Sequence, residues 1–183
     1  MTEQQRKTVP NLARVGLMGG TFDPPHIGHL KISKHALRIL PIKKLYWVVT
    51  KKNPFKNRPF YNLENRIRKC VKMVKKVKKI EIVYLDEKIK SSRTINVINF
   101  FKGKVRSKKI FFIMGSDTLI NFHKWQNYRK IINNCKLVVF SRTGYDQKAL
   151  KSFVAKKWEK NIIFLKNKRF NISSTMIRNK LSD

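Results

Sequence analysis

"VGLMGGTFDPPHIGHLKISKHALRIL", residues 15–40, places a strand, a glycine turn and a helix in direct succession. The short apolar run at 15–18 predicts a buried strand, and the apolar spacing at 27–40 predicts an amphipathic helix. Gly19 and Gly20 directly follow the strand, where the missing Cβ lets backbone N–H groups approach a phosphate closely. The two prolines that follow preset the backbone as it enters the helix. The stretch therefore predicts a phosphate-binding loop.

The same alternation continues along the chain. Short runs rich in β-branched and aromatic residues predict further strands at 45–49, 80–85, 110–114, 137–140 and 162–165. Amphipathic stretches predict further helices at 63–77, 94–102, 117–132, 147–158 and 174–181. Strict alternation implies parallel strands joined by right-handed crossovers. We therefore expect an α/β fold with a doubly wound, Rossmann-like parallel sheet and helices on both faces, whose ligands bind beyond the carboxyl ends of the strands.

Length and composition describe a single folded domain. The chain has 183 residues, of which 42% are hydrophobic, enough to bury one sizeable core. We expect residues 1–183 to form one domain, in which residues 1–13 are a flexible N-terminal segment. Cys70 and Cys135 lack the spacing of a zinc site or a disulfide framework. No apolar run approaches membrane-spanning length, so we expect a cytoplasmic protein without a membrane partner. A homo-oligomer is compatible with the sequence.

The net charge is +33, from 43 Lys and Arg against 10 Asp and Glu. A charge of this size attracts polyanions, and both nucleic acid and nucleotides qualify. The alternative is a composition in which lysine covers every solvated face. Runs such as "VKMVKKVKK", residues 71–79, support it because apolar residues recur between the lysines. We therefore do not expect nucleic acid as a partner, and a nucleic-acid-binding module stays the rival from another functional class.

Two histidines stand at the start of the first predicted helix. His26 and His29 are three residues apart, so both imidazoles lie on one face beside the positive end of the helix dipole, where they can converge on an anion. Gly28 between them leaves room for a purine ring. A metal-binding pair and a purely structural pair are the alternatives, but no acidic or cysteine cluster offers a third metal ligand.

A second candidate phosphate motif lies near the C-terminus, in "ISSTMIR", residues 172–178. Ser173, Ser174 and Thr175 can donate hydroxyl and backbone N–H hydrogen bonds at a helix start. Arg178 follows one turn later and can bind phosphate oxygens with two parallel hydrogen bonds. A simple helix cap is the alternative for the hydroxyl residues.

"GGTFDPPHIGHL", residues 19–30, resembles the signature of the HxGH nucleotidyltransferase superfamily, which includes the class I aminoacyl-tRNA synthetases. A synthetase would also need a "KMSKS"-like loop and a longer chain, whereas "ISSTMIR" resembles the second phosphate motif of the short adenylyltransferases. The resemblance implies that His26, His29 and Arg178 are catalytic. It implies ATP and phosphate binding by Gly19, Gly20, Thr21, Phe22, Gly28, Ser173, Ser174, Thr175 and Arg178.

Within that superfamily, residues 17–181 resemble the bacterial nicotinate-nucleotide adenylyltransferases. "KKNPFK" resembles an NPxK loop and implies that Lys56 approaches the mononucleotide phosphate. "IMGSDTLINFHKW" resembles a GxDxLxxFxxW segment, with Asp117 on ribose hydroxyls and Trp125 stacked on the pyridine ring. "FSRTG" resembles a DRxG stretch and offers Arg142 to the substrate phosphate. Taken singly, these side chains have plain alternatives: a core tryptophan, a helix-capping aspartate and a solvated lysine.

The chain also departs from the family pattern. Where the family shows S-Y-T-x-x-T, residues 92–97 read S-R-T-I-N-V, so Arg93 replaces the aromatic residue and Thr94 stays as a mononucleotide contact. The region after "NPFK" lacks the family's H-K pair. The resemblance implies direct attack of nicotinate mononucleotide on ATP, with Mg²⁺ bound mainly through the ATP phosphates. Phosphopantetheine adenylyltransferase is the nearest rival.

Overall fold

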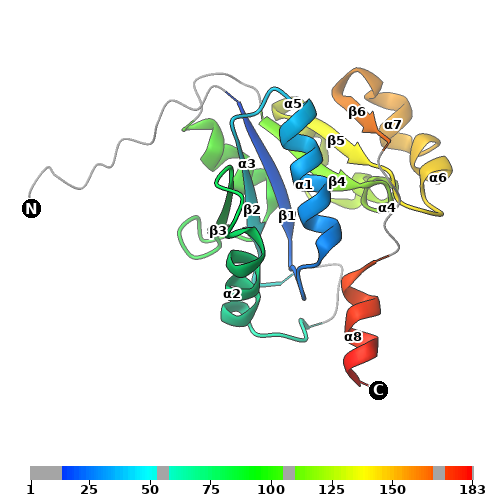
Figure 1. Ribbon diagram of the computed structural model, residues 1–183. Coiled ribbons are helices and arrows are strands. Elements are labelled where there is room, and N and C mark those ends of the chain that lie inside the picture. Colours follow the sequence, from blue (N-terminus) through cyan, green and yellow to red (C-terminus); the bar gives the residue numbers. More distant parts are fainter. Residues whose placement is uncertain (1–13, 53–57, 105–109, 167–171, 183) are drawn as a thin grey trace, which may run out of the picture.

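Strand β1 (Val15–Gly20) lies inside a six-stranded parallel sheet, between β2 (Lys44–Val49) and β4 (Ile110–Gly115). The other strands are β3 (Ile80–Tyr84), β5 (Lys136–Phe140) and β6 (Ile162–Leu165), and the order across the sheet is β3-β2-β1-β4-β5-β6 (Figure 1). This computed structural model describes residues 14–52, 58–104, 110–166 and 172–182, so the predicted segment 1–13 lies outside it. All six predicted strands are confirmed, and Gly19 and Gly20 are the last residues of β1.

Helices cover both faces of the sheet, as predicted. α1 (Ile27–Ile39) and α2 (Leu63–Val74) lie on one face, and α3 (Thr94–Lys102) and α5 (Tyr128–Asn134) lie on the other (Figure 1). Alternate side chains of each strand pack into two separate hydrophobic cores, because successive side chains of a strand point to opposite faces of the sheet. The remaining helices are α4 (Ser116–Ile120), α6 (Asp146–Leu150), α7 (Phe153–Lys157) and α8 (Ser174–Ser182), with 3₁₀ turns η2 (Phe122–Lys124) and η3 (Glu159–Asn161). The doubly wound α/β fold is confirmed.

The predicted single helix at 117–132 is wrong. The chain forms α4, then η2, then α5, and the break lies at Trp125–Asn127. Trp125 has extended backbone angles and Asn127 adopts a left-handed conformation with φ of 58°. Asparagine tolerates that conformation better than most residues. The break turns the Trp125 ring toward Phe122 and Phe112, a tertiary contact that helical periodicity does not reveal.

The predicted single helix at 147–158 is also wrong, because the chain forms two short helices there. It divides into α6 and α7 at Ser152. The Ser152 hydroxyl accepts a hydrogen bond from the Ala155 N–H, so the serine caps a new helix instead of continuing the old one. Both halves turn an apolar face to the same core, with Ala149 and Val154 fully buried, which is why the apolar spacing looked continuous.

The buried guanidinium of Arg66 ties three segments of the chain together. This α2 side chain is 1% exposed. It donates hydrogen bonds to the carbonyl oxygens of Tyr61, Thr21, Thr50 and Lys51, at 2.6 to 3.1 Å. These carbonyls belong to the entry of α2, the loop after β1 and the end of β2. A planar, forked cation suits several carbonyls at once, so Arg66 holds the predicted phosphate loop against the neighbouring strand end.

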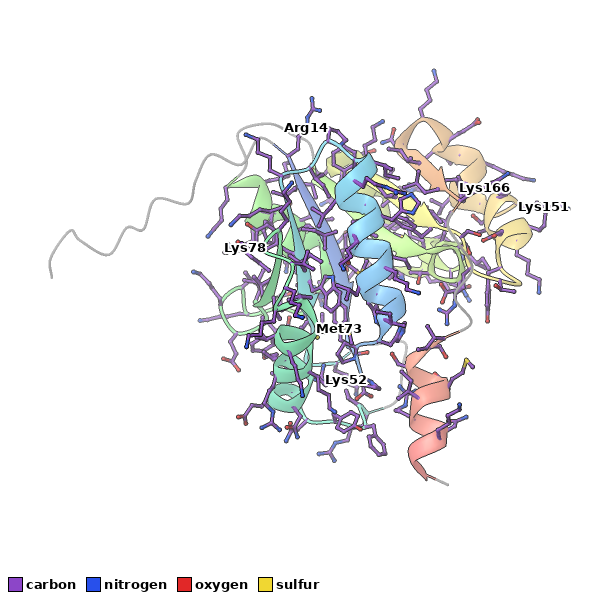
Figure 2. The ribbon with its side chains drawn as sticks, viewed as in Figure 1. Arg14, Lys52, Met73, Lys78, Lys151 and Lys166 are labelled. Carbon is purple, nitrogen blue, oxygen red and sulfur yellow. The ribbon has the colours of Figure 1, made fainter. Side chains whose placement is uncertain are left out.

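The positive charge is spread over many elements. The exposed lysines Lys52, Lys78, Lys151 and Lys166 follow β2, α2, α6 and β6 respectively. In the view of Figure 2, Lys151 and Lys166 lie near each other, and Lys52 and Lys78 lie apart from them. This distribution agrees with lysine as a general surface residue. Among the helices that the structure describes, none combines the length and apolar character needed to cross a membrane.

Arg66→Met should lower the free energy of unfolding by about 3 kcal/mol, because four backbone carbonyls lose charge-assisted hydrogen bonds from a buried guanidinium while the side-chain volume is nearly kept. Arg68→Met is the matched control, since Arg68 is an exposed arginine of the same helix and should change stability by about 0.5 kcal/mol or less. Urea unfolding followed by circular dichroism measures both. Equal stabilities for the two variants would show that Arg66 does not hold these segments.

Candidate active site

The loop after β1 delivers two histidine side chains to one place. His26 is the N-cap of α1, and the centroids of the His26 and His29 rings are 3.8 Å apart. The backbone N–H of His26 donates a hydrogen bond to Nδ1 of His29, at 3.1 Å. Because Nδ1 accepts, the proton of a neutral His29 imidazole resides on Nε2. The predicted convergence of the two imidazoles is confirmed, and His29 presents an N–H donor from its other ring nitrogen.

His26 is held in its neutral form. Burial and, second, the positive charge of Arg142 lower the pKa of His26 from 6.5 to about 4. Its Nδ1 atom is buried and has no hydrogen-bond partner among the described residues. A Cβ at Gly28 would lie 2.9 Å from that Nδ1 atom, so glycine is needed there for the imidazole to pack on the helix. The room that Gly28 provides is therefore used by His26 itself.

A cavity of about 530 Å³ opens beside the histidines, at the carboxyl ends of β1, β4 and β5. This is the place where strand order reverses, as the fold class predicts. The sequence segments that meet there are far apart along the chain. The predicted site residues that line the cavity are Gly19, Gly20, Thr21, His26, Gly28, His29, Asp117, Trp125, Arg142 and Ser174.

An ion pair crosses the α4 side of the cavity. Arg142 Nη1 lies 2.5 Å from Asp117 Oδ2. The backbone N–H of Arg142 donates to Ser116 Oγ at 3.0 Å and to Asp146 Oδ1 at 2.9 Å. Asp146 also accepts hydrogen bonds from the hydroxyls of Ser116 and Ser141. The N-cap of α4 is Gly115, and Asp117, in the first turn, pairs with Arg142 instead of capping the helix. Asp146 fixes the backbone that carries Arg142.

Trp125 belongs both to the core and to the cavity wall. It is half-buried, with its ring centroid 5.0 Å from Phe122 and 6.1 Å from Phe112. The two interpretations of this residue are therefore compatible: one edge of the indole packs against the core while the residue lines the cavity.

The C-terminal motif is hydrogen-bonded to the loop before α1. Ser173 Oγ accepts a hydrogen bond from the Met176 N–H, so this hydroxyl is a helix cap. Ser174 Oγ donates to the carbonyl of Pro24 at 2.9 Å. Arg178 Nη1 donates to the carbonyl of Asp23 at 2.6 Å, and its Nη2 donates to Thr175 Oγ1. Ser174 lines the cavity, whereas Ser173, Thr175 and Arg178 are not among its lining residues.

Two further predicted site residues do not line the cavity. The Phe22 ring is buried below His29, with 5.0 Å between ring centroids, and does not line the cavity. Thr94 is the first residue of α3 and is half-buried away from the cavity wall. Lys56 lies outside the described residues.

Several wall residues escaped the sequence reasoning. Thr118, Asn121 and Lys124 line the cavity between Asp117 and Trp125. The sequence could have indicated them, because they lie between two residues that were predicted to line the site, Asp117 and Trp125. Ser116 and Asp146 left no such signal, since their link to Arg142 depends on the tertiary approach of β4 and β5.

A family model described as cytidylyltransferase-like matches residues 17–180. A protein named "Probable nicotinate-nucleotide adenylyltransferase" in Pelagibacter ubique is 45% identical over 175 residues, covering 95% of this chain and 94% of the relative. This chain belongs to the cytidylyltransferase-like family, among the nicotinate-nucleotide adenylyltransferases. Another relative with the same printed name, from Agrobacterium fabrum, is 33% identical over 90% of this chain and 97% of its own length.

Solved structures agree on the fold of this family. A Plasmodium falciparum nicotinic acid mononucleotide adenylyltransferase complexed with NaAD superposes with a TM-score of 0.75 and 17% identity, over 91% of this chain and 82% of the other. A Vibrio parahaemolyticus structure described as a putative nicotinate-nucleotide adenylyltransferase has a TM-score of 0.64, over 93% and 88% of the two chains. These structures show the same fold, and the family model together with the 45% identical relative confirms the family expected from the sequence motifs.

We expect NMR titration of His26 in the folded protein to give a pKa of about 4. Arg142→Met should raise this pKa but leave it below 6.5, because burial, the larger cause, remains. Arg142→Lys keeps a positive charge and should preserve the wild-type value more closely. As the pH falls, His26 becomes protonated in the unfolded chain near pH 6.5 but in the folded protein only near pH 4. The free energy of unfolding should therefore decrease as the pH falls from 6.5 toward 4. A folded-state pKa at or above 6.5 would contradict this description of the site.

Proposed function

We propose that this chain transfers the adenylyl group of ATP to nicotinate mononucleotide, giving nicotinate adenine dinucleotide and pyrophosphate. The observation that carries the proposal is the meeting of the family's separate motifs on one cavity, within a chain that is 45% identical to a nicotinate-nucleotide adenylyltransferase over nearly its whole length. Enzymes of this family join two nucleotides, and a cavity of about 530 Å³ with a cation, an aromatic ring and histidine donors suits such ligands.

The cavity has two chemically different sides. The β1 and α1 side offers the glycine backbone, His26 and His29, and we assign it to the ATP phosphates. The α4 and η2 side offers Asp117, Trp125 and the Arg142 guanidinium, and we assign it to the mononucleotide. In this assignment the indole provides a flat wall for the pyridine ring, Asp117 accepts ribose hydroxyls, and Arg142 binds the phosphate.

The chemistry needs no general base. The mononucleotide phosphate is already an anion at neutral pH, and its oxygen attacks the α-phosphorus of ATP. One P–O bond forms while the bond from the α-phosphorus to the departing pyrophosphate breaks. Catalysis then depends on positioning and on donors directed at the developing charge. A neutral His26, with a pKa of about 4, fits this requirement because no proton has to be taken up. His29 would donate its Nε2–H to a phosphoryl oxygen in the transition state.

Arg178 would support this chemistry through the loop between β1 and α1. Its guanidinium is hydrogen-bonded to the carbonyl of Asp23, and the Asp23 carboxylate accepts backbone N–H bonds from Phe60 and Tyr61. Arg178 therefore lies where it joins α8 to the loop that carries the histidines. A catalytic contact with ATP, as the family resemblance implies, would require its donors to turn toward the cavity.

Mg²⁺ fits this site as a companion of ATP. Among the described residues, no group of three or more His, Cys, Asp or Glu side chains could hold a metal ion, and Asp117 is paired with Arg142. The ATP phosphates and water would be its ligands, and the ion would neutralise charge on the departing pyrophosphate. We also propose a cytoplasmic location, since both cysteines are buried free thiols and the co-substrate is ATP.

The wild-type enzyme should use nicotinate mononucleotide about 10²-fold better than the amide, measured as kcat/KM by pyrophosphate release. A carboxylate accepts hydrogen bonds through both oxygens, whereas an amide must direct its NH₂ group toward a donor, and each buried mismatch costs roughly 1–3 kcal/mol. Lys124 beside Trp125 adds a cation to that wall. Equal use of acid and amide, or activity with phosphopantetheine instead, would overturn the substrate assignment.

Lys124→Met makes that measurement sharper, because it should lower kcat/KM for the acid more than for the amide. Lys130→Met, an exposed lysine of α5, is the control and should leave both values unchanged.

A further inference from the structure

A buried polar link lies directly behind His29. Ser33 of α1 and Trp47 of β2 are both 0% exposed. The indole Nε1–H of Trp47 donates to Ser33 Oγ at 2.7 Å, and Ser33 Oγ donates to the backbone carbonyl of His29 at 2.8 Å. Each donor therefore has an acceptor, and the short chain connects the central sheet to the turn of helix that carries His29. No motif identified in the sequence includes Ser33 or Trp47.

The geometry of the hydroxyl makes the link specific. A helical serine commonly bonds back to the carbonyl four residues earlier, and that bond alone would satisfy its proton. Here Ser33 Oγ also accepts from a different element, so the position of the His29 carbonyl depends on where β2 places the indole. Burial strengthens both hydrogen bonds because water does not compete for them.

Aromatic rings complete the support. The Phe22 ring stacks on Trp47, with 4.9 Å between centroids and 13° between planes, and it contacts His29 at 5.0 Å. Trp47 itself meets the edge of the His29 ring at 6.0 Å. The imidazole is thus supported from behind by two packed rings, while its Nδ1 accepts the backbone N–H of His26.

We propose that Ser33 and Trp47 are positioning residues for adenylyl transfer: their hydrogen-bonded link to the His29 carbonyl sets where the His29 Nε2–H points. This inference rests on the proposed function, in which His29 acts in the transition state. A displaced donor still permits substrate binding but lowers the rate, because transition-state stabilisation depends steeply on geometry.

Ser33→Ala and the double variant Ser33→Ala/Trp47→Phe separate positioning from folding. The single variant leaves the buried indole N–H without its acceptor and should lose stability. The double variant removes both partners and should regain part of that stability. Both should show kcat about tenfold lower per folded molecule. KM for ATP and for the mononucleotide should stay within about threefold of wild type, a pattern expected when only transition-state interactions weaken.

Ser152→Ala is the matched control, since it also removes a nearly buried serine hydroxyl that caps a helix away from the cavity. It should lose stability and keep kcat. As a readout without substrate, the His29 imidazole cross-peak in ¹H–¹³C spectra should shift in Ser33→Ala and stay in place in Ser152→Ala.

The outcomes distinguish the two proposals. An active wild type in which both Ser33 variants keep kcat within twofold, or in which the His29 resonance is unmoved by Ser33→Ala, would overturn the positioning role. An inactive wild type whose His29 resonance still responds to Ser33→Ala would overturn the adenylyl-transfer function and leave the structural link intact.

Discussion

The reversal of strand order at β1 and β4 constrains the whole site. β1 connects to α1 on one face of the sheet and β4 connects to α4 toward the other, so their loops diverge and leave a crevice at the carboxyl edge. The cavity lies in that crevice, and its lining residues come from strand ends: the two glycines that end β1, Asp117 after β4 and Arg142 after β5. Arg66 and Arg178 then fix the loops around it by binding backbone carbonyls.

Electrostatics complement this geometry. Burial and, second, the positive charge that Arg142 brings to the cavity lower the pKa of His26 to about 4 and keep it neutral. A cavity with an arginine, a neutral His26 imidazole and backbone N–H groups offers several donors to anionic phosphates. The net charge of +33 comes from lysines and arginines on many separate elements of the chain.

The sequence predicted the strands well because each is a compact apolar run, and it predicted the histidine loop because the relevant residues are adjacent. Sequence-based prediction failed where the structure depends on a contact between residues that are far apart in the sequence. The predicted helix at 117–132 is interrupted at Trp125–Asn127, where Trp125 packs against Phe112 of strand β4. Ser33 and Trp47 have ordinary core positions in their own elements, and their link exists only where α1 crosses β2. Arg66, one cation among 43, stands out only once its burial is known.

The most direct test of this account is the effect of His29→Ala on turnover compared with ATP affinity. His35→Ala, on the same helix but away from the cavity, is the control. The account predicts that kcat for His29→Ala falls by ~10²–10³-fold, since a single transition-state donor is lost, while Kd for ATP changes by about threefold or less. Turnover of His29→Ala within about twofold of wild type, or a loss confined to ATP affinity, would contradict it.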